Sequence, residues 1–102
     1  MYAVIFRAKV ADSDEMYFQT AGRMRELACS KYGCLEFVFM MAGEEEIAIS
    51  YWETEEQILN WKKDPEHIKA QEQGRTQWYE SYSVEVCKVE RSYVGARLPT
   101  SV

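Results

Sequence analysis

The side chain with the clearest potential for acid–base chemistry is His67, the only histidine of the chain. An unperturbed imidazole changes its charge near neutral pH, so His67 could act as a general base or as a metal ligand. No metal-binding or triad partner is evident around it. We therefore predict no metal site and keep two interpretations of His67, a catalytic residue and a residue that is only hydrogen-bonded near a helix start.

Arg7 is a second candidate for chemistry. It falls on a strand face that is otherwise apolar at one end, where a charged group must be paired or lie near an opening. The guanidinium could bind a phenolate or a carboxylate, or it could pair with Glu36. We predict that Arg7 is the anion partner of a catalytic His67.

Aromatic residues make up 14% of the chain, which is a high share for a small domain. Trp52, Trp61 and Trp78 could form a flat apolar wall that orients a planar substrate, with Tyr51 and Tyr82 adding polar groups. The alternative is that these residues are ordinary core and interface anchors, since buried aromatic rings stabilise both. Both interpretations stay open at this point.

We predict no chemical role for a run of three glutamates or for the three cysteines. The run Glu44–Glu46 is typical of a solvated turn. Cys29, Cys34 and Cys87 have no zinc-site or CxxC spacing, and we expect them to be reduced thiols.

The pattern of apolar and polar residues along the chain predicts six helices and strands, which would position these side chains. Alternation predicts strands, and apolar residues at helical spacing predict helices. The expected elements are a strand over Tyr2–Val10, a helix that starts at Asp12–Glu15 and stops at Gly33, strands over Cys34–Ala42 and Ile47–Trp52, a helical region from Glu55 to about Glu80, and a strand over Tyr82–Tyr93.

Two local signals divide the long helical region. Thr54 and Gln57 have the spacing of a capping box, in which each side chain bonds the other residue's backbone N–H. Asp64 followed by Pro65 is typical of an N-cap and the first helical position. We therefore expect one helix to begin after Thr54 and a second to begin at Pro65.

The order β-α-β-β-α-β predicts an α+β, ferredoxin-like sandwich: a four-stranded antiparallel sheet with its helices on one face. We expect this domain to span residues 1–94, followed by a loose tail over 95–102. The second strand is apolar on both faces, and soluble monomers rarely expose large apolar patches. We therefore predict that a second copy covers the open face, giving a homodimer.

The composition of the chain indicates which classes of binding partner are not expected. The net charge is −5, and no basic cluster exceeds Lys62-Lys63, so we expect no binding to nucleic acid or to an anionic membrane. No apolar run approaches the roughly 20 residues that span a bilayer, and because the first residues are typical of a strand, we expect no signal peptide. We expect a cytoplasmic protein, in keeping with reduced cysteines.

Several of these segments together resemble the antibiotic biosynthesis monooxygenase family of dimeric α+β barrels. The resemblance rests on four segments: Tyr32–Cys34, Ile47–Glu53, the helix with Trp61 followed by Asp64–His67, and Trp78-Tyr79 with Tyr82. It covers about residues 2–93. It implies a ferredoxin-like protomer with a pocket between sheet and helices, and a partner protomer on the open sheet face.

Members of this family differ in chemistry. Some oxygenate quinol-like aromatic molecules with molecular oxygen and no cofactor, and some degrade heme with a histidine ligand, an asparagine on the first strand and a helix tryptophan. Here Trp61 matches the tryptophan, whereas His67 is closer to it than in the heme pattern and the first strand has no asparagine. The resemblance therefore disfavours heme.

The sequence leaves three functions open. The first is a cofactor-independent monooxygenase for a small planar aromatic or quinol-type molecule, with His67 as base and Arg7 as anion partner. The second is a non-catalytic dimer that binds a small molecule or responds to stress. The third is a protein that binds or degrades heme.

Overall fold

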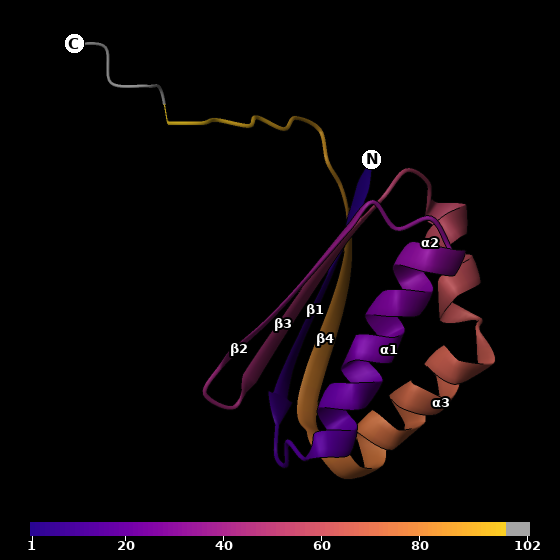
Figure 1. Cartoon of the computed structure of the whole chain (residues 1–102), viewed down its shortest axis with the longest axis vertical. Coiled ribbons are helices and arrows are strands. Elements are labelled where there is room, and N and C mark those ends of the chain that lie inside the picture. Colours follow the sequence, from indigo (N-terminus) through magenta and orange to yellow (C-terminus); the bar gives the residue numbers. More distant parts are fainter. Residues whose placement is uncertain (98–102) are drawn as a thin grey trace.

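The computed structural model describes residues 1–97 of the 102-residue chain. Its elements follow one another as shown in Figure 1. They are β1 (Tyr2–Val10), α1 (Glu15–Lys31), β2 (Glu36–Ala42), β3 (Glu45–Trp52), α2 (Glu55–Lys62), α3 (Pro65–Gln73), the π-helical turn η1 (Gly74–Trp78) and β4 (Tyr79–Lys88).

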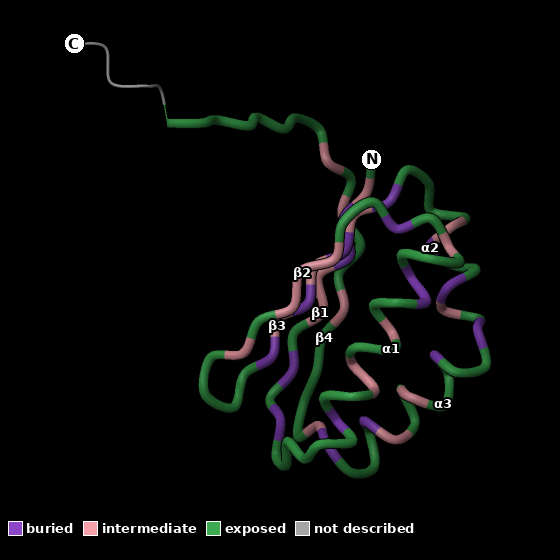
Figure 2. Tube along the Cα trace, in the orientation of Figure 1, coloured by how far each residue is buried: buried purple, intermediate pink, exposed green. Residues whose placement is uncertain are grey.

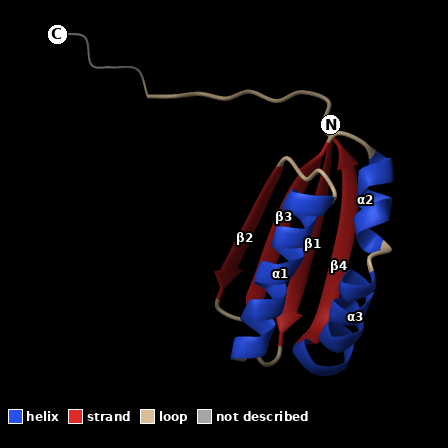
Figure 3. Cartoon of the chain, turned by 45° about the vertical axis from the view of Figure 1, so that its right-hand side comes forward, coloured by secondary structure: helices blue, strands red, loops and turns tan. Residues whose placement is uncertain are grey.

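The four strands form one antiparallel sheet in the order β2-β3-β1-β4. Figures 1 and 3 show that α1, α2 and α3 all lie on the same side of this sheet. The ferredoxin-like α+β fold predicted from the sequence is confirmed. The helical region between β3 and β4 is divided into two α-helices and a π-helical turn.

Side-chain caps explain where the helices begin. Thr54 and Gln57 form the predicted capping box at the start of α2. Asp64 caps α3 by accepting a hydrogen bond from the Glu66 N–H at 2.8 Å, and Pro65 is the first helical residue. In α1 the cap is Asp14 rather than Asp12, because the Asp14 side chain accepts from the Tyr17 N–H at 2.8 Å.

Strand pairing corrects the predicted boundaries of three strands. β2 begins at Glu36, two residues after the predicted start at Cys34. β3 begins at Glu45 rather than Ile47, because Glu45 pairs with both Lys9 and Ala42. β4 spans Tyr79–Lys88 instead of Tyr82–Tyr93, since its partner β1 supplies paired residues only from Val10 back to Tyr2.

The core lies between the sheet and the helices, where Figure 2 shows the buried segments of the strands and of the facing helix turns. It contains two clusters of buried residues. One is centred on Trp52 and Trp61, and the other consists of Val10, Tyr17 and Trp78. Both clusters contribute side chains to the cavity described below.

The chain beyond β4 leaves the body of the domain as an extended segment (Figure 1). Of the tail predicted over 95–102, residues 98–102 lie outside the part that the structure describes. Within residues 1–97, no helix is long and apolar enough to cross a membrane.

Candidate functional site

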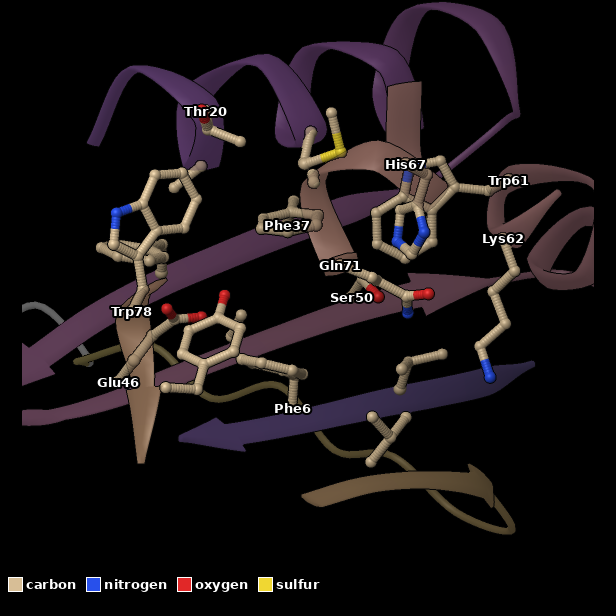
Figure 4. Close-up of a pocket in the computed structure, with 18 of the residues that line it drawn as sticks. Phe6, Thr20, Phe37, Glu46, Ser50, Trp61, Lys62, His67, Gln71 and Trp78 are labelled. Carbon is tan, nitrogen blue, oxygen red and sulfur yellow. The ribbon is translucent and has the colours of Figure 1, made fainter. Parts of the chain in front are cut away.

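A cavity of about 110 Å³ lies between the helix-covered face of the sheet and the helices. Figure 4 shows its polar groups at two ends, with Trp61, His67 and Lys62 at one and Trp78 and Glu46 at the other. Every strand and helix of the domain contributes to its wall. The lining residues are Val4, Phe6, Tyr17, Thr20, Ala21, Met24, Phe37, Phe39, Glu46, Ala48, Ser50, Trp61, Lys62, His67, Ala70, Gln71, Trp78, Tyr79 and Val84.

His67 and Trp61 form the first end. Their ring centroids are 4.3 Å apart in an edge-to-face arrangement, and the His67 side chain is buried. Burial and, to a smaller extent, the charge of Lys62 lower the pKa of His67 against the opposing charge of Asp64, and the pKa that results is about 4. At neutral pH the imidazole is therefore uncharged and is a hydrogen-bonding group in an apolar wall.

Contacts between helices fix the position of this end. The Arg23 guanidinium of α1 makes two hydrogen bonds of 2.9 Å to the Glu66 carboxylate of α3. The Tyr32 hydroxyl donates to Asp64 at 2.5 Å, and this bond lowers the pKa of Asp64. These contacts hold the first turn of α3, and with it His67, against α1.

Glu46 and Tyr17 form the second end together with Tyr79 and Trp78. Glu46 is 5% exposed, and the Tyr17 hydroxyl donates a hydrogen bond to its Oε1 atom. Burial raises the pKa of Glu46, while the bond from Tyr17 acts in the opposite direction. Burial also raises the pKa of Tyr17 and of Tyr79. This end therefore holds three weakly acidic groups in apolar surroundings.

Three buried polar atoms have no hydrogen-bond partner among the described residues, and all three belong to side chains that line the cavity. They are Trp61 Nε1, Trp78 Nε1 and His67 Nδ1. Trp52 differs, because its indole N–H donates to the Ser50 hydroxyl at 2.8 Å. Since buried polar groups are almost always paired, three unpaired nitrogen atoms among the residues of one cavity wall are unusual and call for a partner that the described residues do not supply.

The π-helical turn η1 shapes the second end. It begins at Gly74, and a Cβ atom built there would overlap the ring of Tyr79. Only glycine therefore lets the Tyr79 ring pack against this turn. His67, Ala70, Gly74 and Trp78 follow one another at intervals of three or four residues, and all four lie on the inward side of this helical segment.

The structure brings together three of the residues predicted for the site and separates the others. His67, Trp61 and Trp78 line the cavity. Trp52 lies behind the wall, with its ring centroid 5.3 Å from that of Trp61. Tyr82 is 47% exposed on the edge strand β4 and is not part of the lining.

Arg7 and Tyr51 occupy the other face of the sheet. The register pairs Arg7 with Ile47 and Ser83, all of which point away from the helices, and Arg7 lines a separate surface depression with Lys9 and Glu45. The expected meeting of Arg7 with His67 does not occur within this chain. Arg7 also forms no ion pair with Glu36 among the described residues.

Sequence reasoning missed the polar end of the cavity. The run Glu44–Glu46 was interpreted as solvated, and this is wrong for Glu46, which lies inside β3 and is buried. Alternate residues of a strand face the same side, so Glu46 faces the helices together with Ala48, Ser50 and Trp52. A predicted strand that began at Glu45 would have placed Glu46 on this inward face.

The described residues contain no group of three or more His, Cys, Asp and Glu side chains arranged to hold a metal ion. The cavity instead offers a narrow apolar space with hydrogen-bonding groups at both ends. Its volume is comparable to a cavity of about 150 Å³ that binds benzene in another protein. A single planar ring is therefore a ligand of suitable size.

Comparison with known proteins gives one relative by sequence and many by structure. No protein-family model matches the chain. It is 41% identical over 91 residues to the uncharacterized protein YqjZ of Bacillus subtilis, covering 88% of this chain and 80% of that protein.

The structural relatives include a putative antibiotic biosynthesis monooxygenase from Nitrosomonas europaea, with a TM-score of 0.76, 14% identity, and 89% of this chain and 100% of that chain covered. They also include SnoaB, a cofactor-independent oxygenase from Streptomyces nogalater, with a TM-score of 0.75, 8% identity, and 89% and 94% covered. These likenesses confirm the fold expected from the resemblance.

Proposed function

The chain belongs to the family of Bacillus subtilis YqjZ and has the fold of the antibiotic biosynthesis monooxygenases, and on this premise we propose that it oxygenates a small planar quinol-type molecule with molecular oxygen. No bound cofactor takes part in the proposed reaction. The substrate supplies the electrons, and the protein supplies a dry cavity and hydrogen bonds that orient the ring.

The observation that carries this proposal is the set of unpaired buried nitrogen atoms. Indole N–H groups only donate hydrogen bonds, so Trp61 and Trp78 call for ligand atoms that accept. Oxygen substituents on a ring meet this need, and the aromatic walls favour a flat apolar body. His67, neutral at physiological pH, adds a hydrogen-bonding nitrogen beside Trp61.

The reaction balances without an external reductant. A quinol gives up four electrons to O₂: one oxygen atom replaces a ring hydrogen as a new hydroxyl, and the other leaves as water with the two protons released. The product is a hydroxyquinone. Exclusion of bulk water protects the reactive intermediates of such a reaction, and the cavity is apolar enough to provide it.

We assign each predicted site residue a role that fits its position in the structure. His67 hydrogen-bonds the ligand, Trp61 and Trp78 form its walls and donate to its oxygen atoms, and Trp52 supports Trp61 from behind. Arg7 has no role in this cavity, since it lies on the other face of the sheet.

We propose that the functional unit is a homodimer formed through that other face. Val38, Met40, Ile47 and Ile49 lie side by side there on β2 and β3, and the register extends this apolar surface to Ile5 on β1. A second copy of the same surface would remove it from water.

The test of the proposed function is oxygen uptake with a panel of benzoquinols and naphthoquinols, followed by mass spectrometry of the product formed under ¹⁸O₂. We expect one labelled oxygen atom per product and faster uptake with single-ring quinols. The variant Ala70→Phe fills the cavity from α3 and should abolish uptake, whereas Ile68→Phe places the same ring on the exposed side of that helix and should not.

Binding of quinols without uptake above the buffer rate would contradict the oxygenase proposal and leave a binding protein. Uptake that Ala70→Phe does not change would place the reaction outside this cavity.

A further inference from the structure

Glu46 is a buried carboxyl group whose position in the structure is not explained by an ion pair. It is 5% exposed, and the ion pairs of the described residues all involve other acidic side chains. Taking a carboxylate out of water is costly unless it is paired, so a buried carboxyl without a cation is a candidate functional group.

The surroundings of Glu46 leave part of its carboxyl group free to contact a ligand. On β3 it pairs with Ala8 of β1 and Met41 of β2, neither of which is titratable. Tyr17 from α1 donates to Oε1, and Tyr79, the first residue of β4, is a second titratable group near it. Glu46 also borders the surface depression that is lined by Arg7, Lys9 and Glu45. A carboxylate accepts about four hydrogen bonds, and the Tyr17 hydroxyl uses one of them.

Glu46 also belongs to the lining of the cavity itself. Figure 4 shows its carboxyl group at the end where Trp78 lies, with Phe6 below the cavity. Trp78 lies at the same end, and the benzo edge of its ring faces the other lining residues (Figure 4). A ring hydroxyl group at this end would therefore lie between an aromatic wall and the Glu46 carboxylate.

We propose that Glu46, held in place by Tyr17, accepts the proton of the ligand hydroxyl group, an assignment that rests on the proposed quinol oxygenation. In this step the ligand O–H bond breaks, an O–H bond forms on the Glu46 carboxylate, and the ligand becomes a phenolate. No electrons leave the ligand in this step. The electron-rich phenolate is the species that then reacts with O₂.

Comparison of Glu46 with His67, the carboxyl and imidazole groups of the cavity lining, supports Glu46 as the proton acceptor. A general base works best when its pKa lies near the operating pH. Burial lowers the pKa of His67 to about 4, so a protonated imidazole is disfavoured there. Burial moves the pKa of Glu46 upwards, in the direction that favours its protonated form after the transfer.

The test compares Glu46→Gln with Glu44→Gln in oxygen uptake with the best quinol. Glutamine keeps the size of the side chain but is a far weaker proton acceptor, so kcat should fall about 100-fold or more while KM changes by less than about threefold. Glu44 is exposed in the neighbouring turn, and its variant should match the wild type. Equal kcat in all three proteins would overturn the assignment.

A second variant separates a chemical role from a structural one. Tyr17→Phe removes the hydrogen bond that holds the pKa of Glu46 down, so the acidic limb of the kcat profile should move to higher pH. A lower kcat with the limb unmoved would mean that Tyr17 and Glu46 only maintain the structure.

Failure of the oxygenation proposal is distinguishable from failure of this one. If the wild type consumes no oxygen with any quinol, the absorbance of bound 4-nitrophenol decides the matter instead. A shift towards the nitrophenolate spectrum in the wild type and in Glu44→Gln, lost in Glu46→Gln, supports Glu46 as proton acceptor. The same spectrum in all three proteins would contradict it.

Discussion

At the scale of single residues, burial determines the chemistry of His67. The imidazole is 8% exposed, and its edge-to-face contact with Trp61 places it in apolar surroundings. Its neutral form is therefore the one that the fold stabilises. At physiological pH His67 is therefore an uncharged hydrogen-bonding residue, and in the proposed reaction the proton goes to Glu46 at the other end of the cavity.

The lowered pKa of His67 predicts a dependence of stability on pH. An unfolded chain binds the proton near pH 6.5 and the folded chain only near pH 4, so the unfolded state takes up more protons between these values. The contribution of His67 is therefore complete above about pH 6.5 and is lost as the pH falls towards 4. The loss amounts to about 3 kcal/mol.

Urea denaturation of the wild type and of His67→Leu at several pH values measures this contribution. Because Asp64, Glu66 and Glu46 titrate in both proteins, their effects cancel in the difference. We expect that difference to change between pH 6.5 and 4 in favour of the variant. A constant difference across this range would show that His67 titrates normally.

Sequence reasoning identified cavity-lining residues where the periodic pattern is long and missed one at an element end. His67, Trp61 and Trp78 were predicted as candidates because their type and spacing are visible in the chain. Glu46 was not, because a run of three glutamates resembles a solvated turn, and its burial depends on a strand extended by pairing with Lys9 and Ala42. Arg7 was assigned to a site on the wrong face because sequence does not say which strand face the helices cover.

At the scale of elements, the continuous path from α3 through η1 into β4 shapes one side of the cavity. Asp64 and Pro65 start α3, and the change to π-helical geometry at Gly74 leads into the strand at Tyr79. π-helical turns often occur at functional sites. Here the turn carries Trp78 into the cavity and packs against the Tyr79 ring.

Gly74→Ala tests the packing at this turn. The added Cβ would overlap the Tyr79 ring, so we expect a loss of about 1–3 kcal/mol in the free energy of unfolding and weaker quinol binding. Gly22→Ala is the matched control, because it lies in α1 with no atom within 4 Å of the new Cβ, and it should stabilise by about 0.5–1 kcal/mol. Stabilisation of similar size in both variants would contradict the packing role.

At the scale of the whole molecule, the helices cover one sheet face and leave the other to solvent. Figure 3 shows this single layer of helices. The open face carries Ile47 and Ile49 in β3, flanked by Val38 and Met40 in β2. The element order and the alternation within strands were sufficient to predict this arrangement, because two or three helices cannot cover both faces of a four-stranded sheet.

The exposed apolar face predicts a dimer in solution. Light scattering should give twice the chain mass of 12.0 kDa, and Ile49→Glu, at the centre of that face, should give a monomer. Glu53→Gln, at an exposed residue beyond the end of β3, serves as a control and should remain dimeric. A wild-type protein that scatters as a monomer at micromolar concentration would mean that the open face is not an interface.

The central claim is that a planar molecule with oxygen atoms on its ring binds between the sheet and the helices. The most direct measurement is an NMR titration of ¹⁵N-tryptophan-labelled protein with hydroquinone under nitrogen. The signals of the three indole N–H groups report on binding. We predict saturable downfield shifts for Trp61 and Trp78, whose N–H groups are unpaired, and a much smaller shift for Trp52, which already bonds Ser50. Unmoved signals for Trp61 and Trp78 at millimolar ligand would contradict the account.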